Sequence, residues 1–237
     1  MRLDKFLCDA GIGSRKDIKK LIKSGEVRVE GRNSVRPEDH INPENDKVFF
    51  KNALVSYKEF IYLMMNKPQG YISATFDKRL PTVIDLVPEE FLHYDLFPAG
   101  RLDIDTEGLL LLTNDGQLAH NILSPKKHIP KTYYAKIAGK VTDGDAVAFS
   151  QGVIIDGDIK TKPADLEILV SGEISEINLT ITEGKFHQVK RMFEAVGKSV
   201  VYLKRTKMNK LPLDENLALG EIRELTETEI NLIKEGI

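Results

Sequence analysis

Residues 100–116 read Gly-Arg-Leu-Asp-Ile-Asp-Thr-Glu-Gly-Leu-Leu-Leu-Leu-Thr-Asn-Asp-Gly, and this stretch decides the fold. Four consecutive leucines, 109–112, follow an acidic turn and end at a second turn, Asn114-Asp115-Gly116. A short apolar run bounded by turn residues predicts a buried strand. The acidic residues before it therefore lie where a rigid element begins, a position that can hold one reactive carboxylate in a fixed geometry.

Two other interpretations of the same stretch compete with a catalytic one. Asp103, Asp105, Glu107 and Gly108 match positions one, three, five and six of a calcium-binding EF-hand loop. That loop needs a bidentate Glu at its twelfth position, where this chain has Asn114, so the calcium interpretation is disfavoured. A loop Asp also commonly caps a turn. We prefer a catalytic Asp103 because the rest of the chain agrees with it.

The composition is that of an ordinary globular protein. The 237 residues are 41% hydrophobic and 30% charged, long enough for one large domain or for a small and a large one. No apolar stretch reaches membrane-spanning length, and the N-terminus lacks the apolar core of a signal peptide. We expect a cytoplasmic protein without a membrane partner. A single cysteine, Cys8, excludes an internal disulfide and is expected to be a buried structural thiol.

The charge is distributed unevenly along the chain. The net charge is only −2, yet residues 1–36 hold ten Lys/Arg against five Asp/Glu, a local charge of +5. Residues 185–210 hold eight Lys/Arg against Glu194 alone, a local charge of +7. Two separate basic segments on a nearly neutral chain indicate a polyanion that is bound at two sites.

Residues 1–52 are expected to form a small module, followed by a polar linker over 53–59. Leu3, Phe6 and Leu7 predict a short first helix, and Ser14 predicts the cap of a second one, with Asp17 as its capping-box partner. Alternation at residues 27–29 predicts a strand. The second helix carries five cations against one carboxylate, more than a merely solvated face needs. The basic face has no aromatic stacking platform, so we expect recognition of phosphates and shape rather than of bases. The five cations are Arg15, Lys16, Lys19, Lys20 and Lys23.

Residues 60–237 are expected to form a larger domain of α+β class with a mainly antiparallel sheet. Short strands are predicted at 60–65, from 71, and at 132–138, 152–155, 165–170 and 175–182. Helices are fewer, near 82–86, 116–122, 187–196 and the C-terminus. This order lacks the regular strand–helix alternation of an α/β fold.

Three segments of the large domain carry a recognisable pattern. They are Asn66-Lys67-Pro68-Gln69-Gly70-Tyr71 with the later Pro98-Ala99-Gly100-Arg101-Leu102-Asp103, then Lys131-Thr132-Tyr133, then Glu183-Gly184-Lys185-Phe186-His187-Gln188-Val189-Lys190-Arg191-Met192-Phe193. In their order, spacing and residue identities, these segments resemble the motifs of the RsuA-type pseudouridine synthases, which isomerise uridine in ribosomal RNA. The helix–helix–hairpin module at residues 1–50 resembles the S-four (αL) RNA-binding domain, so the resemblance covers nearly the whole chain.

The resemblance implies roles for three residues. Asp103 is the catalytic carboxylate, acting either as a nucleophile or by stabilising positive charge at C1′. Lys190 matches the family's basic residue and would neutralise Asp103, with Arg191 as the alternative. Tyr133, selected by the Lys-x-Tyr pattern over Tyr134, could stack under the target ring and act as a general base.

RNA contacts are expected from both basic segments and from the catalytic loop. The target base must leave its stack to reach the carboxylate, and Arg101 is a candidate to fill the space or hold the backbone. The predicted RNA-binding set beyond the helix cations comprises Arg2, Arg101, Lys131, Lys185, His187, Gln188 and Arg191. The histidines lack metal-ligand spacing, and no phosphate or dinucleotide loop is present, so neither a metal nor a cofactor is expected.

The resemblance is greatest to the small-subunit subtype of the family, and it implies an enzyme that converts a specific uridine of small-subunit (16S) rRNA to pseudouridine. Its expected partner is ribosomal RNA, within a partly assembled small subunit, and the protein itself is expected to be a monomer. A non-catalytic RNA-binding ribosome-assembly factor is the rival from another class. A large-subunit rRNA-specific member of the same family is the rival within it.

Overall fold

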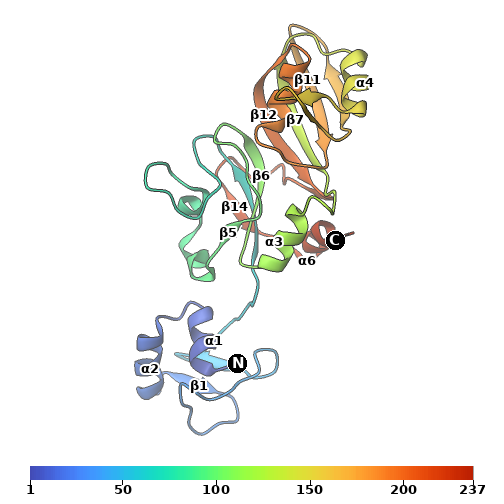
Figure 1. Ribbon diagram of the computed structural model, residues 1–237. Coiled ribbons are helices and arrows are strands. Elements are labelled where there is room, and N and C mark those ends of the chain that lie inside the picture. Colours follow the sequence, from blue (N-terminus) through green and yellow to red (C-terminus); the bar gives the residue numbers. More distant parts are fainter. Residues whose placement is uncertain (237) are drawn as a thin grey trace. The chain divides into compact units, whose positions relative to one another are not determined.

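The computed structural model describes residues 1–236, which fold into two compact units (Figure 1). The smaller unit contains Met1–Ile61 and also a later segment, Pro88–Asp95. The larger unit contains Tyr62–Val87 and the chain from Leu96 onward. The chain therefore leaves the larger unit once and returns to it. Across residues 1–236, no helix is long and apolar enough to cross a membrane.

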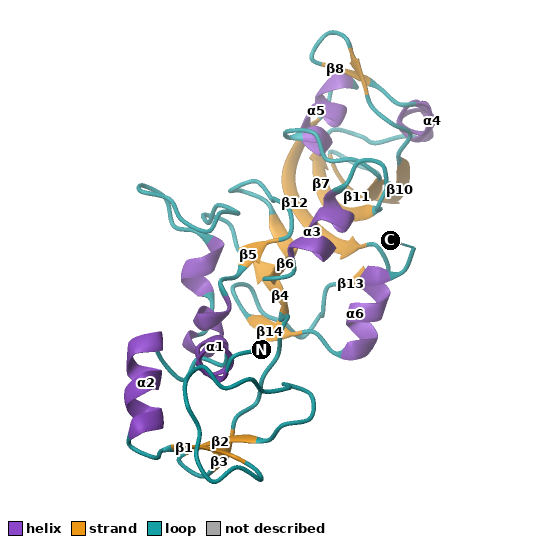
Figure 2. Cartoon of the chain, turned by 60° about the horizontal axis from the view of Figure 1, so that its bottom comes forward, coloured by secondary structure: helices purple, strands orange, loops and turns teal. Residues whose placement is uncertain are grey.

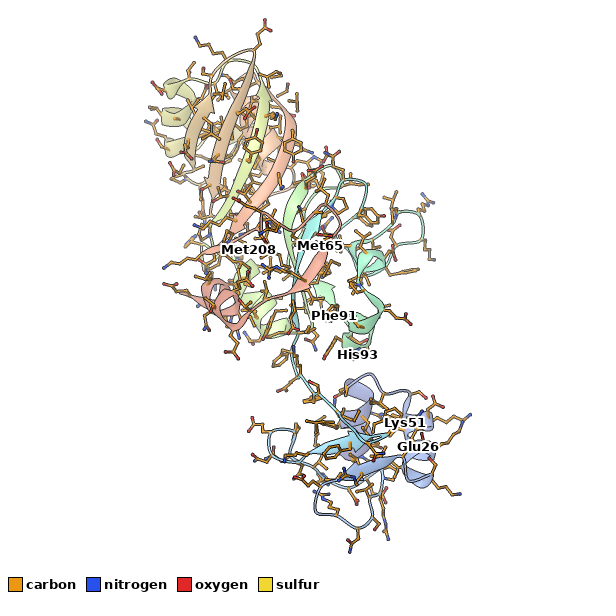
Figure 3. All side chains as sticks on the ribbon, turned by 180° about the vertical axis from the view of Figure 1, so that it is seen from behind. Glu26, Lys51, Met65, Phe91, His93 and Met208 are labelled. Atoms are coloured by element: carbon orange, nitrogen blue, oxygen red, sulfur yellow. The ribbon has the colours of Figure 1, made fainter. Side chains whose placement is uncertain are left out.

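The smaller unit packs two helices on a short antiparallel sheet. Its elements are α1 (Leu3–Asp9), α2 (Arg15–Lys23), β1 (Val27–Val29), β2 (Val48–Phe50) and β3 (Ala53–Leu54), with strand order β1-β2-β3. The predicted cap of α2 is confirmed, since Ser14 accepts a hydrogen bond from the Asp17 backbone N–H. Leu3, Phe6 and Ile18 are buried between the helices and the sheet. An ion pair joins Glu26 to Lys51 at the edge (Figure 3).

The segment Pro88–Asp95 contributes a 3₁₀ helix, η2 (Glu89–Tyr94), to the smaller unit. The His93 ring lies against Gly11, where a Cβ would approach the ring to 2.8 Å. Gly11 also has φ +76°, so both backbone conformation and space require glycine there. Figure 3 labels His93 and Phe91 on this segment.

The larger unit is built on one mixed sheet of nine strands (Figure 2). The main path is β10-β11-β7-β12-β6-β4-β14, with β13 paired to β12 and β5 to β6. The strands are β4 (Tyr62–Lys67), β5 (Phe97–Pro98), β6 (Glu107–Thr113), β7 (Lys131–Ala138), β10 (Asp165–Val170), β11 (Ile174–Ile181), β12 (Ser199–Met208), β13 (Leu211–Pro212) and β14 (Ile222–Glu224). All pairs are antiparallel except β12 with β6. The predicted α+β class is confirmed.

Five helices and a small hairpin complete this unit. They are η1 (Val83–Leu86), α3 (Gly116–Leu123), α4 (Asp143–Gln151), α5 (Gln188–Ala195), α6 (Glu227–Lys234) and the hairpin β8 (Ile154–Ile155) with β9 (Ile159–Lys160). Helices α3 and α6 cover a core that includes Leu109, Leu111, Ile122, Met208 and Ile233. Met65 and Met208 are fully buried (Figure 3).

Several predicted elements differ from the structure. The strand expected from residue 71 is only an isolated bridge between Ile72 and Thr82, and the helix at 82–86 is a 3₁₀ turn. Helix α4 and the ten-residue strand β12 were not predicted. The strand expected at 60–65 begins at Tyr62 and continues through Lys67, two residues beyond its expected end.

The parallel seam between β12 and β6 positions the site. Arg205 pairs with Gly108 in register, and the backbones approach so closely that a Cβ on Gly108 would lie 2.2 Å from the Arg205 carbonyl oxygen. Only glycine permits this approach. The loop that carries the acidic residues enters β6 at this seam.

Candidate active site

Asp103 lies in a loop that is fixed at both sides by backbone contacts. The hydroxyl of Ser73 donates to the Leu102 carbonyl and accepts from the Leu102 N–H, each at 3.0 Å. The Gly70 N–H donates to the Ile104 carbonyl at 2.8 Å, and the Thr106 N–H donates to the Asp103 carbonyl at 3.0 Å. The loop is therefore held in one conformation immediately before and after Asp103.

A buried lysine, Lys67, supports this loop through hydrogen bonds to its backbone carbonyls. Lys67 is fully buried, and its ammonium donates to the carbonyls of Pro68, Asp103 and Thr106 at 3.0, 3.1 and 3.0 Å. Burial lowers the pKa of Lys67 to about 8, although the carboxylates of Asp103 and Asp105 oppose this shift. Sequence reasoning missed Lys67 as part of the site. A lysine ending an otherwise apolar strand was the available signal.

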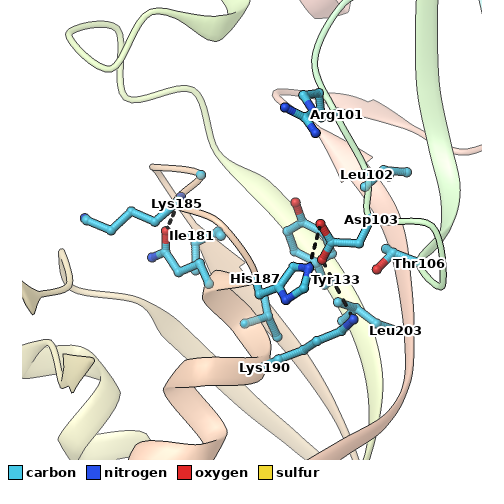
Figure 4. Close-up of a pocket in the computed structure, with 13 residues that line it drawn as sticks. Arg101, Leu102, Asp103, Thr106, Tyr133, Ile181, Lys185, His187, Lys190 and Leu203 are labelled. Atoms are coloured by element: carbon cyan, nitrogen blue, oxygen red, sulfur yellow. Dashed lines mark hydrogen bonds and ion pairs between the residues drawn. The ribbon is translucent and has the colours of Figure 1, made fainter. Parts of the chain in front are cut away.

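The Asp103 carboxylate faces two basic side chains from the start of α5 (Figure 4). Its Oδ1 lies 3.7 Å from His187 Nε2, and its Oδ2 lies 3.8 Å from Lys190 Nζ. The Asp103 side chain is 30% exposed, so a substrate can reach it. Lys190 thus approaches Asp103 as predicted, at the distance of an ion pair.

Lys190 makes its shorter contacts with a second carboxylate. Its Nζ lies 2.6 and 2.7 Å from the two carboxylate oxygens of Asp105. Burial raises the pKa of Asp105, but the hydrogen bond and charge of Lys190 outweigh it and hold that pKa below its ordinary value. Lys190 is therefore shared between Asp105 and Asp103, an arrangement the sequence did not predict.

Arg191 is turned away from Asp103. Its guanidinium pairs with Asp156 and donates from Nη1 to the Phe186 carbonyl at 2.5 Å. These contacts connect α5 to the β8–β9 hairpin and to the loop before the helix. Within this structure Lys190, not Arg191, is the cation next to Asp103.

Tyr133 and Tyr134 lie on opposite faces of β7, as strand alternation requires. Tyr133 is 8% exposed and lines a cavity together with Asp103. Tyr134 instead donates its hydroxyl to Glu176 at 2.7 Å and lies edge-on to Tyr202. Burial, followed by the Glu176 contact, raises the pKa of Tyr134 to about 12. Tyr133 is thus the tyrosine that faces Asp103.

The cavity at Asp103 has a volume of about 70 Å³ and collects seven of the nine site residues that were predicted in the larger unit. It is lined by Arg101, Asp103, Tyr133, Lys185, His187, Gln188 and Lys190, among others (Figure 4). His187 begins α5 in a left-handed conformation, with φ 50°, and its ring stacks on the exposed Phe186 at 3.7 Å between centroids. Arg191 does not line this cavity, and Lys131 lines the neighbouring one.

The remaining predicted RNA-binding residues lie in the smaller unit. Arg2, Arg15 and Lys19 line a shallow cavity at α1 and α2, where Arg2 forms an ion pair of 2.8 Å with Asp4. On α2, Lys16 and Lys23 are exposed and Lys20 lies 3.7 Å from Asp17. These cations form a separate basic face. Among residues 1–236, no group of three His, Cys, Asp or Glu side chains could hold a metal ion.

The larger unit thus places a carboxylate beside a lysine and a buried tyrosine, and the same chain carries a basic helical module. Comparison with known proteins specifies the class. Residues 61–195 match the RNA pseudouridylate synthase family, and residues 1–46 match the S4 domain. The chain belongs to the RNA pseudouridylate synthase family and is a pseudouridine synthase.

Relatives match over almost the full length. An uncharacterized RNA pseudouridine synthase of Bacillus subtilis, YtzG, is 52% identical, with 99% of each chain covered. The ribosomal small subunit pseudouridine synthase A of Escherichia coli is 42% identical over 97% of this chain and 98% of its own. A solved structure described as a pseudouridylate synthase is 41% identical, covers 98% of this chain and 99% of its own, and has a TM-score of 0.69.

Proposed function

We propose that this pseudouridine synthase acts on a uridine of small-subunit (16S) ribosomal RNA, with Asp103 as the catalytic carboxylate. The observation that carries the proposal is the meeting of Asp103, Tyr133 and Lys190 in one cavity, although they come from three separate segments. The small-subunit substrate is supported by the near full-length similarity to the synthase of E. coli.

The chemistry requires no gain or loss of atoms. The N1–C1′ bond of uridine breaks, the uracil rotates, and a C5–C1′ bond forms, while C5 loses its proton and N1 carries one in the product. Asp103 either attacks as a nucleophile or stabilises the positive charge that develops at C1′. Lys190 supplies a positive charge 3.8 Å from this carboxylate.

Tyr133 is proposed to lie against the target base and to accept a proton during the rearrangement. Its burial beside Asp103 supports this role, because a ring held on one face of a rigid strand offers a fixed surface for stacking. Arg101, Lys185, His187 and Gln188, which line the same cavity, are proposed RNA contacts. The base enters after extrusion from folded RNA.

The smaller unit, Met1–Ile61 with Pro88–Asp95, is proposed to hold the RNA through phosphate contacts, and the larger unit to carry out the isomerisation. The expected division into residues 1–52, a linker at 53–59 and a domain at 60–237 shifts, because β3 pairs with β2 and residues 88–95 belong to the smaller unit. The cations of α2 support an RNA-binding role of the smaller unit, because they are exposed and few of them pair with a carboxylate. We further propose that a monomer acts in the cytoplasm on a partly assembled small subunit.

The test is release of tritium from rRNA that carries 5-³H-uridine, because only C5–C1′ bond formation frees that label. Wild-type protein should release tritium from 16S transcripts or small-subunit precursors, and Asp103→Asn should not. Release from 23S transcripts alone would identify the large-subunit alternative. RNA binding without any release would identify the non-catalytic assembly factor.

A further inference from the structure

A second, larger cavity adjoins the catalytic one. Its volume is about 500 Å³, within the range of nucleotide-sized sites. Arg101, Tyr133 and Lys185 line both cavities, so the two are neighbours across β7 and the catalytic loop. The larger one is also lined by Ser124, Lys131, Glu183 and Arg205.

The charges around this cavity do not balance. Four cations line it, Arg101, Lys131, Lys185 and Arg205, against the single carboxylate of Glu183. That carboxylate is already occupied. It accepts hydrogen bonds from Lys185 Nζ, from Gln188 Nε2 at 2.7 Å and from the Lys162 N–H at 2.9 Å. Within residues 1–236, the other three cations have no carboxylate partner.

One of these unpaired cations, Arg205, is fully buried, and a second, Lys131, is partly buried. Arg205 is 1% exposed; its Nε donates to the Leu109 carbonyl at 2.7 Å, while its Nη2 has no hydrogen-bond partner within residues 1–236. Within the described residues, 1–236, the Lys131 ammonium donates one hydrogen bond, to the Ile129 carbonyl at 3.0 Å. Burial, and secondarily the charge of Arg205, lowers the pKa of Lys131 to about 8. Buried cations without a counter-charge are costly and call for an anionic ligand.

We propose that this cavity is a phosphate subsite, in which Lys131, Arg205 and Arg101 bind a backbone phosphodiester of the nucleotide whose base enters the Asp103 cavity. The proposal rests on the proposed function, because it takes RNA as the ligand. The ligand chemistry is specific: the two non-bridging oxygens of a phosphodiester share one negative charge. That charge should offset part of the positive charge of the three cations that protein carboxylates leave unpaired.

The test compares the dinucleotide UpU with its methylphosphonate analogue, which keeps the shape of the linkage but removes its charge. Dissociation constants in the millimolar range can be measured by NMR titration of the full-length protein. We expect wild type to bind UpU at least roughly tenfold more tightly than the neutral analogue, and Lys131→Met to lose most of that preference. Equal affinities of wild type for the two probes would overturn the proposal.

A matched control lies on the same strand. Lys136 is on the opposite face of β7 and pairs with Glu176 at 3.5 Å, so Lys136→Met should keep the preference for UpU. If Lys131→Met does not fold, Arg101→Met serves instead, because Arg101 is exposed. Retention of the full preference in a folded Lys131→Met or Arg101→Met variant would also contradict the subsite.

The pH dependence gives a readout that a purely structural lysine would not affect. A bound phosphodiester favours the charged form of Lys131, so the preference for UpU should fall as the pH rises from 7 to 9. The other titratable or charged groups that face this cavity are Arg101, Tyr133, Glu183, Lys185 and Arg205. The fall should be absent in Lys131→Met; the same fall in that variant would refute the assignment.

The same titration in Asp103→Asn separates this proposal from the proposed function. The subsite predicts an unchanged preference for UpU in that variant, whether or not tritium is released from rRNA by wild type. Tritium release by wild type together with equal binding of the two probes would contradict the subsite alone.

Discussion

The Nζ atom of Lys190 lies 3.8 Å from Oδ2 of Asp103, while it lies within 2.7 Å of both carboxylate oxygens of Asp105. One ammonium thus serves two carboxylates that are two residues apart. Two like charges so close would favour protonation of one of them, and the shared cation opposes this. Asp105 therefore helps to fix the position of Lys190 relative to Asp103.

Asp103→Asn should abolish tritium release while leaving the fold and RNA affinity nearly unchanged. The amide has the same shape but is neither charged nor a nucleophile. Asp105→Asn is the matched comparison and should retain measurable turnover, because Asp105 contacts Lys190 and not the substrate-facing cavity. Turnover of Asp103→Asn within tenfold of wild type would refute the catalytic assignment.

Lys190→Met should lower kcat and move the acid limb of the pH–rate profile to higher pH. Without the ammonium, the pKa of Asp105 should rise from its lowered value, and one of the two neighbouring carboxylates should take up a proton more readily. Arg191→Met is the control. Its contacts are with Asp156 and the Phe186 carbonyl, so it should raise the KM for RNA and leave the pH profile in place. A shifted pH profile in Arg191→Met together with an unshifted one in Lys190→Met would exchange the roles assigned to these two residues.

Lys67→Met should lower stability and kcat together. Three buried carbonyls, including those of Asp103 and Thr106, would lose their donor, which should reduce the free energy of unfolding by at least about 2 kcal/mol. The loop should then hold Asp103 less firmly, so kcat should fall more than KM changes. Denaturant unfolding and steady-state kinetics check this, with the exposed Lys140→Met as control. A Lys67→Met variant with wild-type stability and kcat would contradict it.

Replacing Lys16 and Lys23 by Gln should weaken rRNA binding and reduce its salt dependence. The slope of log K against log salt should become shallower by roughly 0.7 to 0.9 for each phosphate that the variant no longer neutralises. Lys47 and Lys51 already pair with Glu30 and Glu26, so the corresponding double variant should change the slope little. Equal slopes for wild type and the Lys16/Lys23 variant would mean that α2 is only a solvated face.

Glu229→Gln should destabilise the protein at neutral pH but not in strong acid. Hydrogen bonds from Arg223, at 2.7 and 2.9 Å, lower the pKa of Glu229 to about 2. A lowered carboxylate pKa gives stability that is present above about 4.5 and lost as the pH falls through about 2. We expect a loss of about 1–2 kcal/mol at pH 7, after discounting for solvent screening.

Urea unfolding at pH 7 and at successively lower pH measures the effect of Glu229→Gln. Glu227→Gln, an exposed position on the same helix, is the control and should change little. A difference between wild type and Glu229→Gln that stays constant down to pH 2 would contradict the prediction.

Elements with a strong local signal were predicted from the sequence. The leucine run 109–112 lies in β6, and the Ser14–Asp17 pair begins α2, because an apolar run and a capping pair act over a few residues. Helix α4 was missed because it lacks an apolar stripe: Phe149 is its one buried hydrophobic residue. Its start depends on the capping box of Thr142 and Asp145.

Features that depend on distant partners were not predictable. Strand β12 contains Lys204, Arg205 and Lys207 and therefore resembles an exposed segment, yet Arg205 is buried through its bond to Leu109, 96 residues away. The contact of Lys190 with Asp105 likewise spans 85 residues. That Asp103, Tyr133 and Lys190 meet was expected from a resemblance, since local pattern carries no distances.

Because residues 88–95 belong to the smaller unit, that unit cannot be cut off or exchanged as one continuous piece of chain. Its covalent border with the larger unit is crossed three times, after Ile61, after Val87 and after Asp95. A protease cut at one of these points would leave the two units covalently connected at the other two points. A chimera that exchanges the first fifty residues alone would place a foreign surface against His93, at the position where Gly11 leaves room for its ring. The smaller unit is thus a discontinuous domain, whose transplantation requires two inserts and not one.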